Sequence, residues 1–179
     1  MLAYVFWQWP RSEVTAADYE KSLALFFHGL KTHKPRGFID CFGLRLSSFP
    51  WNAPGSRGYE DWYLLEDFES LGVLNDAAVS REMKATHDTV ALLAGGGAGG
   101  IYKRYGNHSS NKIQFSSWFT KPVGMSYQDL RSELAQVIPE GYWQRQMTLG
   151  PAPEFCLHGH ESRLLPQKLK SVTVDVKQL

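Results

Sequence analysis

The sequence predicts an α+β fold in which a β-α-β-β-α-β unit occurs twice in one chain, the second time in trimmed form. Three observations predict this. Apolar segments of strand length and amphipathic segments of helical period alternate in that order, the order starts again after residue 110, and similar capping and closing motifs mark the first helix of each half. We expect residues 1–110 and 111–179 to be two halves of one compact unit.

The first half begins with residues 2–9, whose almost continuous apolar sequence is typical of a strand covered on both faces. Thr15 and Asp18 then have the spacing of a capping box, and they precede an apolar stripe of helical period between Tyr19 and Leu30. The next elements are expected to be strands at residues 38–47 and 59–66, a helix at 67–94 with a weak point near 72–75, and a short strand at 101–105. The glycine-rich residues 95–100 are predicted to be a flexible turn that ends the second helix.

The second half repeats this order. Ser126 and Asp129 form another capping-box pattern, and residues 139–142 close the helix as residues 35–38 close the first one. Strands are expected at residues 112–120, 142–149, 154–160 and 171–177. Because the last connection is too short for a full helix, the second half is predicted to lack its last helix.

This element order, with its aromatic-rich strands, resembles the dimeric α+β barrel superfamily. That superfamily includes the antibiotic-biosynthesis monooxygenases, the stress-responsive barrel proteins and the EthD-like family. His28-Gly29-Leu30 and His33-Lys34-Pro35 each match part of an EthD-like segment, and residues 58–68 resemble the third strand of that family and the start of its second helix. The resemblance implies two ferredoxin-like units, fused here in one chain, whose antiparallel sheets form a barrel.

The composition disfavours several classes of protein. A net charge of +1 without a long basic run gives no electrostatic footprint for nucleic acid. No apolar stretch is long enough to span a bilayer, and two cysteines do not make a disulfide framework. We therefore expect a cytoplasmic protein that binds neither nucleic acid nor membrane and is a monomer or a homodimer.

Aromatic residues make up 13% of the chain. This content indicates either an aromatic-rich core or an aromatic-lined cavity for an apolar ligand. For the second interpretation, a pocket is expected between the helices of the first half and the sheet. Its wall is predicted to include several of Trp7, Trp9, Phe26, Phe27, Trp62 and Met83.

Two histidines are candidates for catalysis. His87 lies on an apolar helical face between Met83 and Val90, so it is either a hydrogen-bonded core histidine or a proton-transfer group at the pocket. Asp88 is expected to point about 100° away from it on a helix. His33 is the second candidate, although the favoured explanation for it is a cation at the helix C-terminus, where it interacts with the helix dipole.

A metal site is not expected. His158 and His160, two residues apart on a strand, can chelate one ion, but Cys156 is too far from His160 and no further ligand is apparent. Residues 95–100 contain G-x-G-x-x-G without the strand before it and the helix after it that a dinucleotide site needs. No cofactor is therefore predicted.

The sequence leaves three functions open. The first is an enzyme that acts on a small apolar or aromatic metabolite by proton transfer or by cofactor-free oxygen chemistry. The second is a protein that binds such a molecule without chemistry. The third is a haem-binding barrel, as in some members of the superfamily, with His87 or His33 as the ligand.

Overall fold

The computed structural model describes the chain except residues 49, 52–57, 107–111, 139–140, 149 and 161–164. The elements of the first half are β1 (Leu2–Pro10), α1 (Ala16–His33), β2 (Phe38–Leu46), β3 (Gly58–Leu65), α2 (Phe68–Ala78), α3 (Lys84–Leu93) and β4 (Ala94–Tyr105). Those of the second half are β5 (Phe115–Phe119), α4 (Tyr127–Val137), β6 (Tyr142–Gln146), β7 (Phe155–Gly159), the short 3-10 helix η1 (Gln167–Leu169) and β8 (Val172–Gln178).

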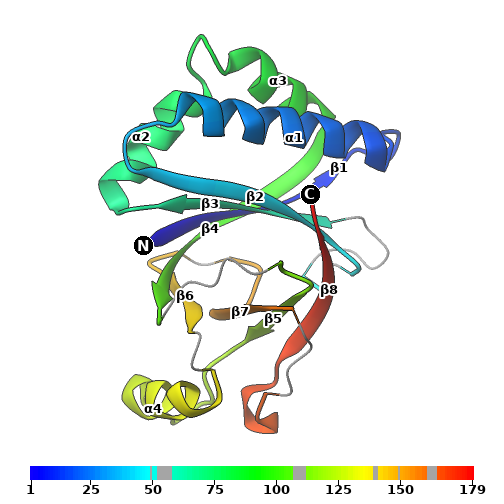
Figure 1. Ribbon diagram of the computed structural model, residues 1–179. Helices are drawn as coiled ribbons and strands as arrows, with labels where there is room; N and C mark the ends of the chain where they lie inside the picture. The colour runs from blue at the N-terminus through cyan, green and yellow to red at the C-terminus, as the bar shows by residue number, and fades with distance from the viewer. Residues whose placement is uncertain (49, 52–57, 107–111, 139–140, 149, 161–164) are drawn as a thin grey trace.

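The strands form a closed barrel in the order β1-β3-β2-β8-β5-β7-β6-β4, and neighbouring strands are antiparallel. The expected α+β fold with an antiparallel barrel is thus confirmed. Figure 1 shows α1, α2 and α3 together over the strands of the first half, while α4 lies at the opposite end of the molecule. The helices therefore cover the barrel from outside.

The two halves have the same internal strand order. In the first it is β4-β1-β3-β2 and in the second β8-β5-β7-β6, and the pairs β2–β8 and β4–β6 join the halves. This repeat of topology is what a duplicated unit would produce. That the two halves arose by duplication and superpose stays a prediction.

Both expected capping boxes start a helix. The Thr15 hydroxyl accepts a hydrogen bond from the Asp18 backbone N–H at 3.1 Å, and Ser126 makes the same contact with Asp129 at 3.1 Å. These bonds satisfy N–H groups that a helix N-terminus leaves without an intrahelical partner. The predicted apolar stripe of α1 is also confirmed, since the helix buries Tyr19, Leu23, Phe26, Phe27 and Leu30.

The glycine-rich run is strand rather than turn, so that prediction was wrong. Residues 95–100 belong to β4 and pair along β1, with Gly97 opposite Gln8 and Gly99 opposite Phe6. A Cβ atom on Gly97 would lie within 2.3 Å of the Phe6 ring. Glycine is needed because aromatic rings of β1 occupy the space that a Cβ atom on β4 would take.

The helical region after β3 breaks at residues 79–83 and not near 72–75. Turn hydrogen bonds join Ser80 N–H to the Ala77 carbonyl and Met83 N–H to the Ser80 carbonyl, both at 3.1 Å. The break lets Met83 pack on α1, where its sulfur would lie 2.9 Å from a Cβ built on Gly29. The break thus coincides with the point where Met83 lies close against α1.

Alternation along β1 divides the core into two layers. Leu2, Tyr4 and Phe6 face the helices, whereas Ala3, Val5 and Trp7 face the barrel interior. A third apolar cluster lies in the second half and includes Leu130 and Leu134 of α4. The layer under α1–α3 is the one that contains the candidate site.

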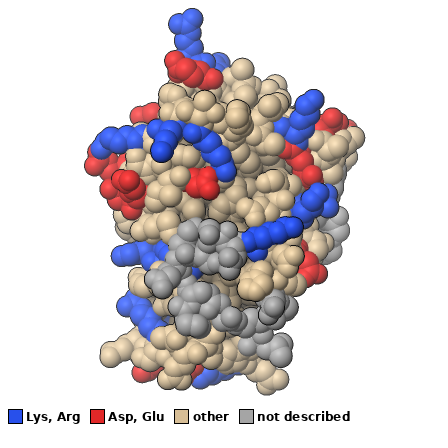
Figure 2. All heavy atoms as spheres, viewed as in Figure 1, with Lys and Arg blue, Asp and Glu red and all other residues tan. Residues whose placement is uncertain are grey.

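On the face seen in Figure 2, Lys and Arg side chains are interspersed with Asp and Glu side chains over the helical end of the molecule. In the part of the chain that the structure describes, no helix is both long enough and apolar enough to cross a membrane.

Candidate functional site

A cavity of about 940 Å³ lies between α1, α2 and α3 and the outer face of the sheet. This volume is within the range of sites for small ligands. Most of the lining is apolar, and it comes from β1, β3, β4 and the three helices. Its polar and ionisable side chains belong to Tyr4, Gln8, Asp61, Tyr63, Asn75, Asp76 and His87.

The expected aromatic wall is only partly the one that lines this cavity. Phe26 lines it, but Trp7 and Trp62 lie in the barrel interior and Trp9 packs against that interior cluster. Phe27 and Met83 belong to the core between helices and sheet, yet they lie outside the cavity lining. The rings that the strands contribute are Tyr4, Phe6 and Tyr63, because the tryptophans point to the opposite face of the sheet.

Asp61 of β3 is the most deeply buried ionisable group of the cavity, with 1% of its surface exposed. The Gln8 side-chain amide donates a hydrogen bond to its Oδ2 atom, and the Tyr63 hydroxyl donates to the same atom at 3.3 Å. The Tyr19 hydroxyl donates to the Gln8 carbonyl oxygen at 2.6 Å and so fixes the orientation of that amide. The other carboxyl oxygen, Oδ1, has no hydrogen-bond partner among the described residues.

Burial raises the pKa of Asp61 well above its usual value, and the nearby Glu60 carboxylate acts in the same direction. The hydrogen bonds from Tyr63 and Gln8 lower this pKa and only partly offset the burial. The structure thus favours the neutral acid at the inner wall of the cavity.

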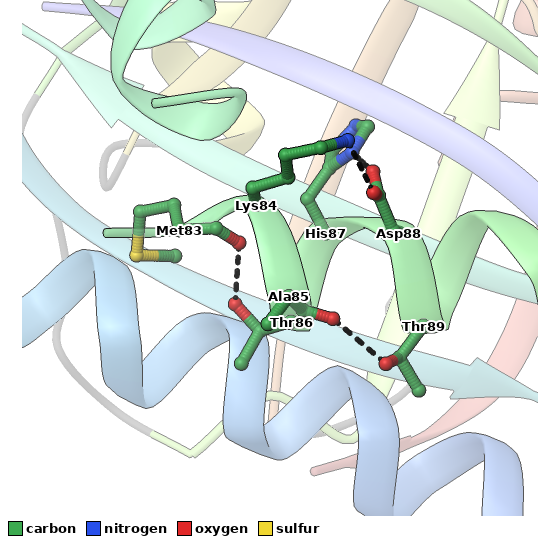
Figure 3. Close-up of polar contacts among 7 residues, drawn as sticks. All are labelled: Met83, Lys84, Ala85, Thr86, His87, Asp88 and Thr89. Atoms are coloured by element: carbon green, nitrogen blue, oxygen red, sulfur yellow. Dashed lines mark hydrogen bonds and ion pairs between the residues drawn. The ribbon is translucent and has the colours of Figure 1, made fainter. Parts of the chain in front are cut away.

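His87 lines the cavity from α3, and its ring packs against Phe26 with 6.0 Å between the ring centroids. Its Nδ1 atom lies 3.2 Å from the Asp88 carboxylate, which also pairs with Lys84 at 2.5 Å (Figure 3). The expectation that Asp88 points away from His87 was therefore wrong, since both side chains bend toward each other. His87 keeps 38% of its side chain exposed, so it can exchange protons with solvent.

Two other described histidines of the first half, His28 and His33, lie elsewhere. His33 is the last residue of α1, and both His33 and His28 are exposed and lie outside the cavity lining. The structure thus brings His87 and Phe26 to the cavity, and it adds Asp61, Tyr63 and Gln8, which the sequence analysis missed. The catalytic role of His87 and the ligand-binding role of Phe26 stay predictions.

Glu60 precedes Asp61 on β3 and points to the opposite side, into the barrel. Trp62 and Trp118 donate indole hydrogen bonds to its carboxylate at 3.2 and 3.1 Å, and the Ser116 hydroxyl contributes a longer one at 3.4 Å. Burial raises the pKa of Glu60 to about 7, although these donors lower it. The Trp7 indole N–H also lowers the pKa of Glu60. Its geometry does not meet the criteria for a hydrogen bond.

A signal for both carboxylates exists in the sequence. Within the strand predicted at residues 59–66, the adjacent acids Glu60 and Asp61 are surrounded by apolar and aromatic residues. Adjacent strand residues point to opposite faces, and every residue of β3 is buried. Two adjacent acids in a strand covered on both sides therefore predict one buried carboxylate on each face.

The possible metal ligands of β7 have other neighbours. The Cys156 thiol lies 3.5 Å from the Ser116 hydroxyl, and the His158 ring packs on Trp62 with 4.4 Å between centroids. Within the described residues, no group of three or more His, Cys, Asp or Glu side chains could hold a metal ion.

Neither the models of known protein families nor the curated proteins include a match to this sequence. Among solved structures, the chain is similar to a candidate monooxygenase from Fusobacterium nucleatum subsp. nucleatum, with a TM-score of 0.53, 10% identity, and coverage of 98% of this chain and 74% of the other. A candidate monooxygenase from Lactobacillus acidophilus gives a TM-score of 0.52, 10% identity, and coverage of 98% and 76%. At this identity the likeness shows the fold, which is compatible with the dimeric α+β barrel superfamily.

Proposed function

We propose that this protein is an enzyme that acts by proton transfer on a small apolar or aromatic molecule bound between α1–α3 and the sheet. The observation that carries the proposal is one cavity of about 940 Å³ with a mostly apolar wall, a partly exposed histidine and a buried carboxyl group. An apolar wall favours an apolar ligand, and the few polar groups fix its orientation.

In this proposal His87 is the general base. A neutral imidazole accepts a proton from the ligand, and the exposed part of the ring then passes that proton to water. The contact between Nδ1 and Asp88 supports this role, because a carboxylate beside Nδ1 holds the proton there and leaves Nε2 to act as the base. Lys84 holds Asp88 in place through its own ion pair.

Cofactor-free oxygen chemistry can follow from the same step, since removal of a proton from a ring compound produces an electron-rich anion. Two solved structures with a similar fold are candidate monooxygenases, and this supports oxygen chemistry as an extension of the proposal. Proton transfer is nevertheless the part that the residues of this chain support.

Exchange of carbon-bound hydrogen tests the proposal without knowledge of the natural substrate. Acetonaphthone, an apolar ring compound with exchangeable hydrogens beside its carbonyl group, is incubated with the protein in D₂O, and deuterium uptake is followed by mass spectrometry. We expect the wild type to accelerate uptake and His87→Gln to slow it by about 100-fold or more, a typical contribution of a general base. His28→Gln, an exposed histidine of α1 outside the cavity, is the matched control and should retain the full rate.

Two results separate the alternatives. Binding of acetonaphthone without accelerated exchange would identify a binding protein rather than an enzyme. A strong visible absorption band of the purified protein, lost in His87→Gln, would favour a haem-binding barrel.

A further inference from the structure

The two oxygens of the Asp61 carboxyl group have unequal surroundings. Among the described residues, the Gln8 amide and the Tyr63 hydroxyl donate hydrogen bonds to this group, and both reach Oδ2. Oδ1 is buried on the cavity side of the sheet, and no described residue is its hydrogen-bond partner. An unpaired buried polar atom costs free energy unless a ligand or water satisfies it.

The identity of the two donors decides where a proton on Asp61 would lie. The Gln8 amide nitrogen can only donate, and its orientation is set because its carbonyl oxygen accepts from Tyr19. With two donors directed at Oδ2, a protonated Asp61 carries its hydrogen on Oδ1. The cavity then presents a hydroxyl donor with no acceptor from the described chain.

We propose that Asp61 binds the ligand as a neutral acid, and that its Oδ1–H group donates a hydrogen bond to a carbonyl oxygen on an otherwise apolar ring compound. This inference rests on the proposed function, because it assigns the ligand of the same cavity. It makes Asp61 a specificity-determining residue and names ring ketones and related neutral carbonyl compounds as the ligand class.

The surroundings of Asp61 support the neutral form. The group is 1% exposed, and the rings of Tyr4, Phe6 and Tyr63 line the cavity around it. The Glu60 carboxyl on the other face of the strand adds repulsion to any charge on Asp61. These features disfavour the opposite assignment, in which an ionised Asp61 binds a cationic or hydrogen-bond-donating ligand.

A pair of probes and a pair of variants test this assignment. Acetonaphthone and ethylnaphthalene, substituted at the same ring carbon, have similar shape, but only the first has a carbonyl oxygen. Their dissociation constants are measured by equilibrium dialysis with wild type, Asp61→Asn and Asp61→Leu. Asparagine can accept both hydrogen bonds with its oxygen and direct its NH₂ group to the cavity, so it reproduces the neutral acid. Leucine removes the donor and keeps a side chain of similar size.

The expected quantity is the preference for the ketone, given by the ratio of the two dissociation constants. We expect Asp61→Asn to retain the wild-type preference and Asp61→Leu to lower it by about tenfold, the effect of one lost hydrogen bond to the carbonyl oxygen. In infrared spectra, the carbonyl stretch of bound acetonaphthone should lie at lower frequency in wild type and Asp61→Asn than in Asp61→Leu.

Three results would overturn the inference. Equal preference in wild type and Asp61→Leu would show that Asp61 does not bind the carbonyl, and the proposed function would stand. Loss of the preference in Asp61→Asn would show that the charge of Asp61 is needed. If neither probe binds any of the proteins, both the inference and the proposed function fail.

Discussion

Replacement of Glu60 by glutamine should remove a pH-dependent loss of stability. The Glu60 side chain is completely buried among the tryptophans of the barrel interior, and burial raises its pKa from 4.5 to about 7. A raised pKa means that the folded protein binds this proton more tightly than the unfolded chain does. The stability that the group contributes is therefore fully present below pH 4.5 and is lost as the pH rises through about 7.

The size of this effect follows from the two pKa values. Between pH 5 and pH 8, the proton linkage of one carboxyl group with these values lowers the free energy of unfolding by about 2–3 kcal/mol. This is a large part of the stability of an ordinary domain, which is about 5–15 kcal/mol. The raised pKa of Asp61 also lowers stability as the pH rises. Because Asp61 is present in both wild type and Glu60→Gln, the difference between these two proteins reports Glu60 and its repulsion of Asp61.

The assay is urea unfolding followed by tryptophan fluorescence at pH 5 and pH 8. Glutamine cannot titrate, so the free energy of unfolding of wild type minus that of Glu60→Gln should fall by about 2–3 kcal/mol between the two pH values. Glu133→Gln, which changes a surface carboxylate paired with Lys168, is the control and should shift by less than about 0.5 kcal/mol. Parallel pH dependence of wild type and Glu60→Gln would refute the reasoning, because it would show an ordinary pKa for Glu60.

Two further pairs of variants test the packing around the cavity. Gly97→Ala should destabilise the protein by about 1–3 kcal/mol, because the added methyl group must displace the Phe6 ring. Gly72→Ala should be neutral or stabilising, because its added methyl group meets no atom within 4 Å. Thermal unfolding of the two variants tests this difference. Thr15→Ala and Ser126→Ala should each cost about 1 kcal/mol as lost helix caps, but only Thr15→Ala should weaken binding of acetonaphthone, because α1 lines the cavity and α4 does not. Equal weakening by both cap variants would contradict this placement of the site.

Much of the fold could be predicted from local patterns. The caps at Thr15 and Ser126 and the stripe of α1 depend on neighbouring residues only, and the structure confirms them. The glycine run of β4 could not be assigned in this way. Its strand conformation depends on rings of β1 that are almost a hundred residues away in the sequence, such as Phe6 opposite Gly99.

The site was harder to predict because it depends on which face of the sheet each side chain occupies. His87 could be selected from its apolar helical face. Trp7 and Trp62 are as aromatic as Phe6 and Tyr63, and only the pairing of the strands and the position of the helices decide which of them line the cavity. The adjacent acids Glu60 and Asp61 indicate a buried carboxylate on each face, but the hydrogen bonds that orient Asp61 come from Gln8 and Tyr19, which are distant in sequence.

A crystal structure of the protein grown with acetonaphthone tests the central claim most directly. The account predicts that the naphthalene ring lies in the cavity between α1–α3 and the sheet, in contact with Phe26, with the carbonyl oxygen within hydrogen-bond distance of Asp61 Oδ1. A ligand bound elsewhere, or a cavity closed by its own side chains at saturating ligand, would contradict the account.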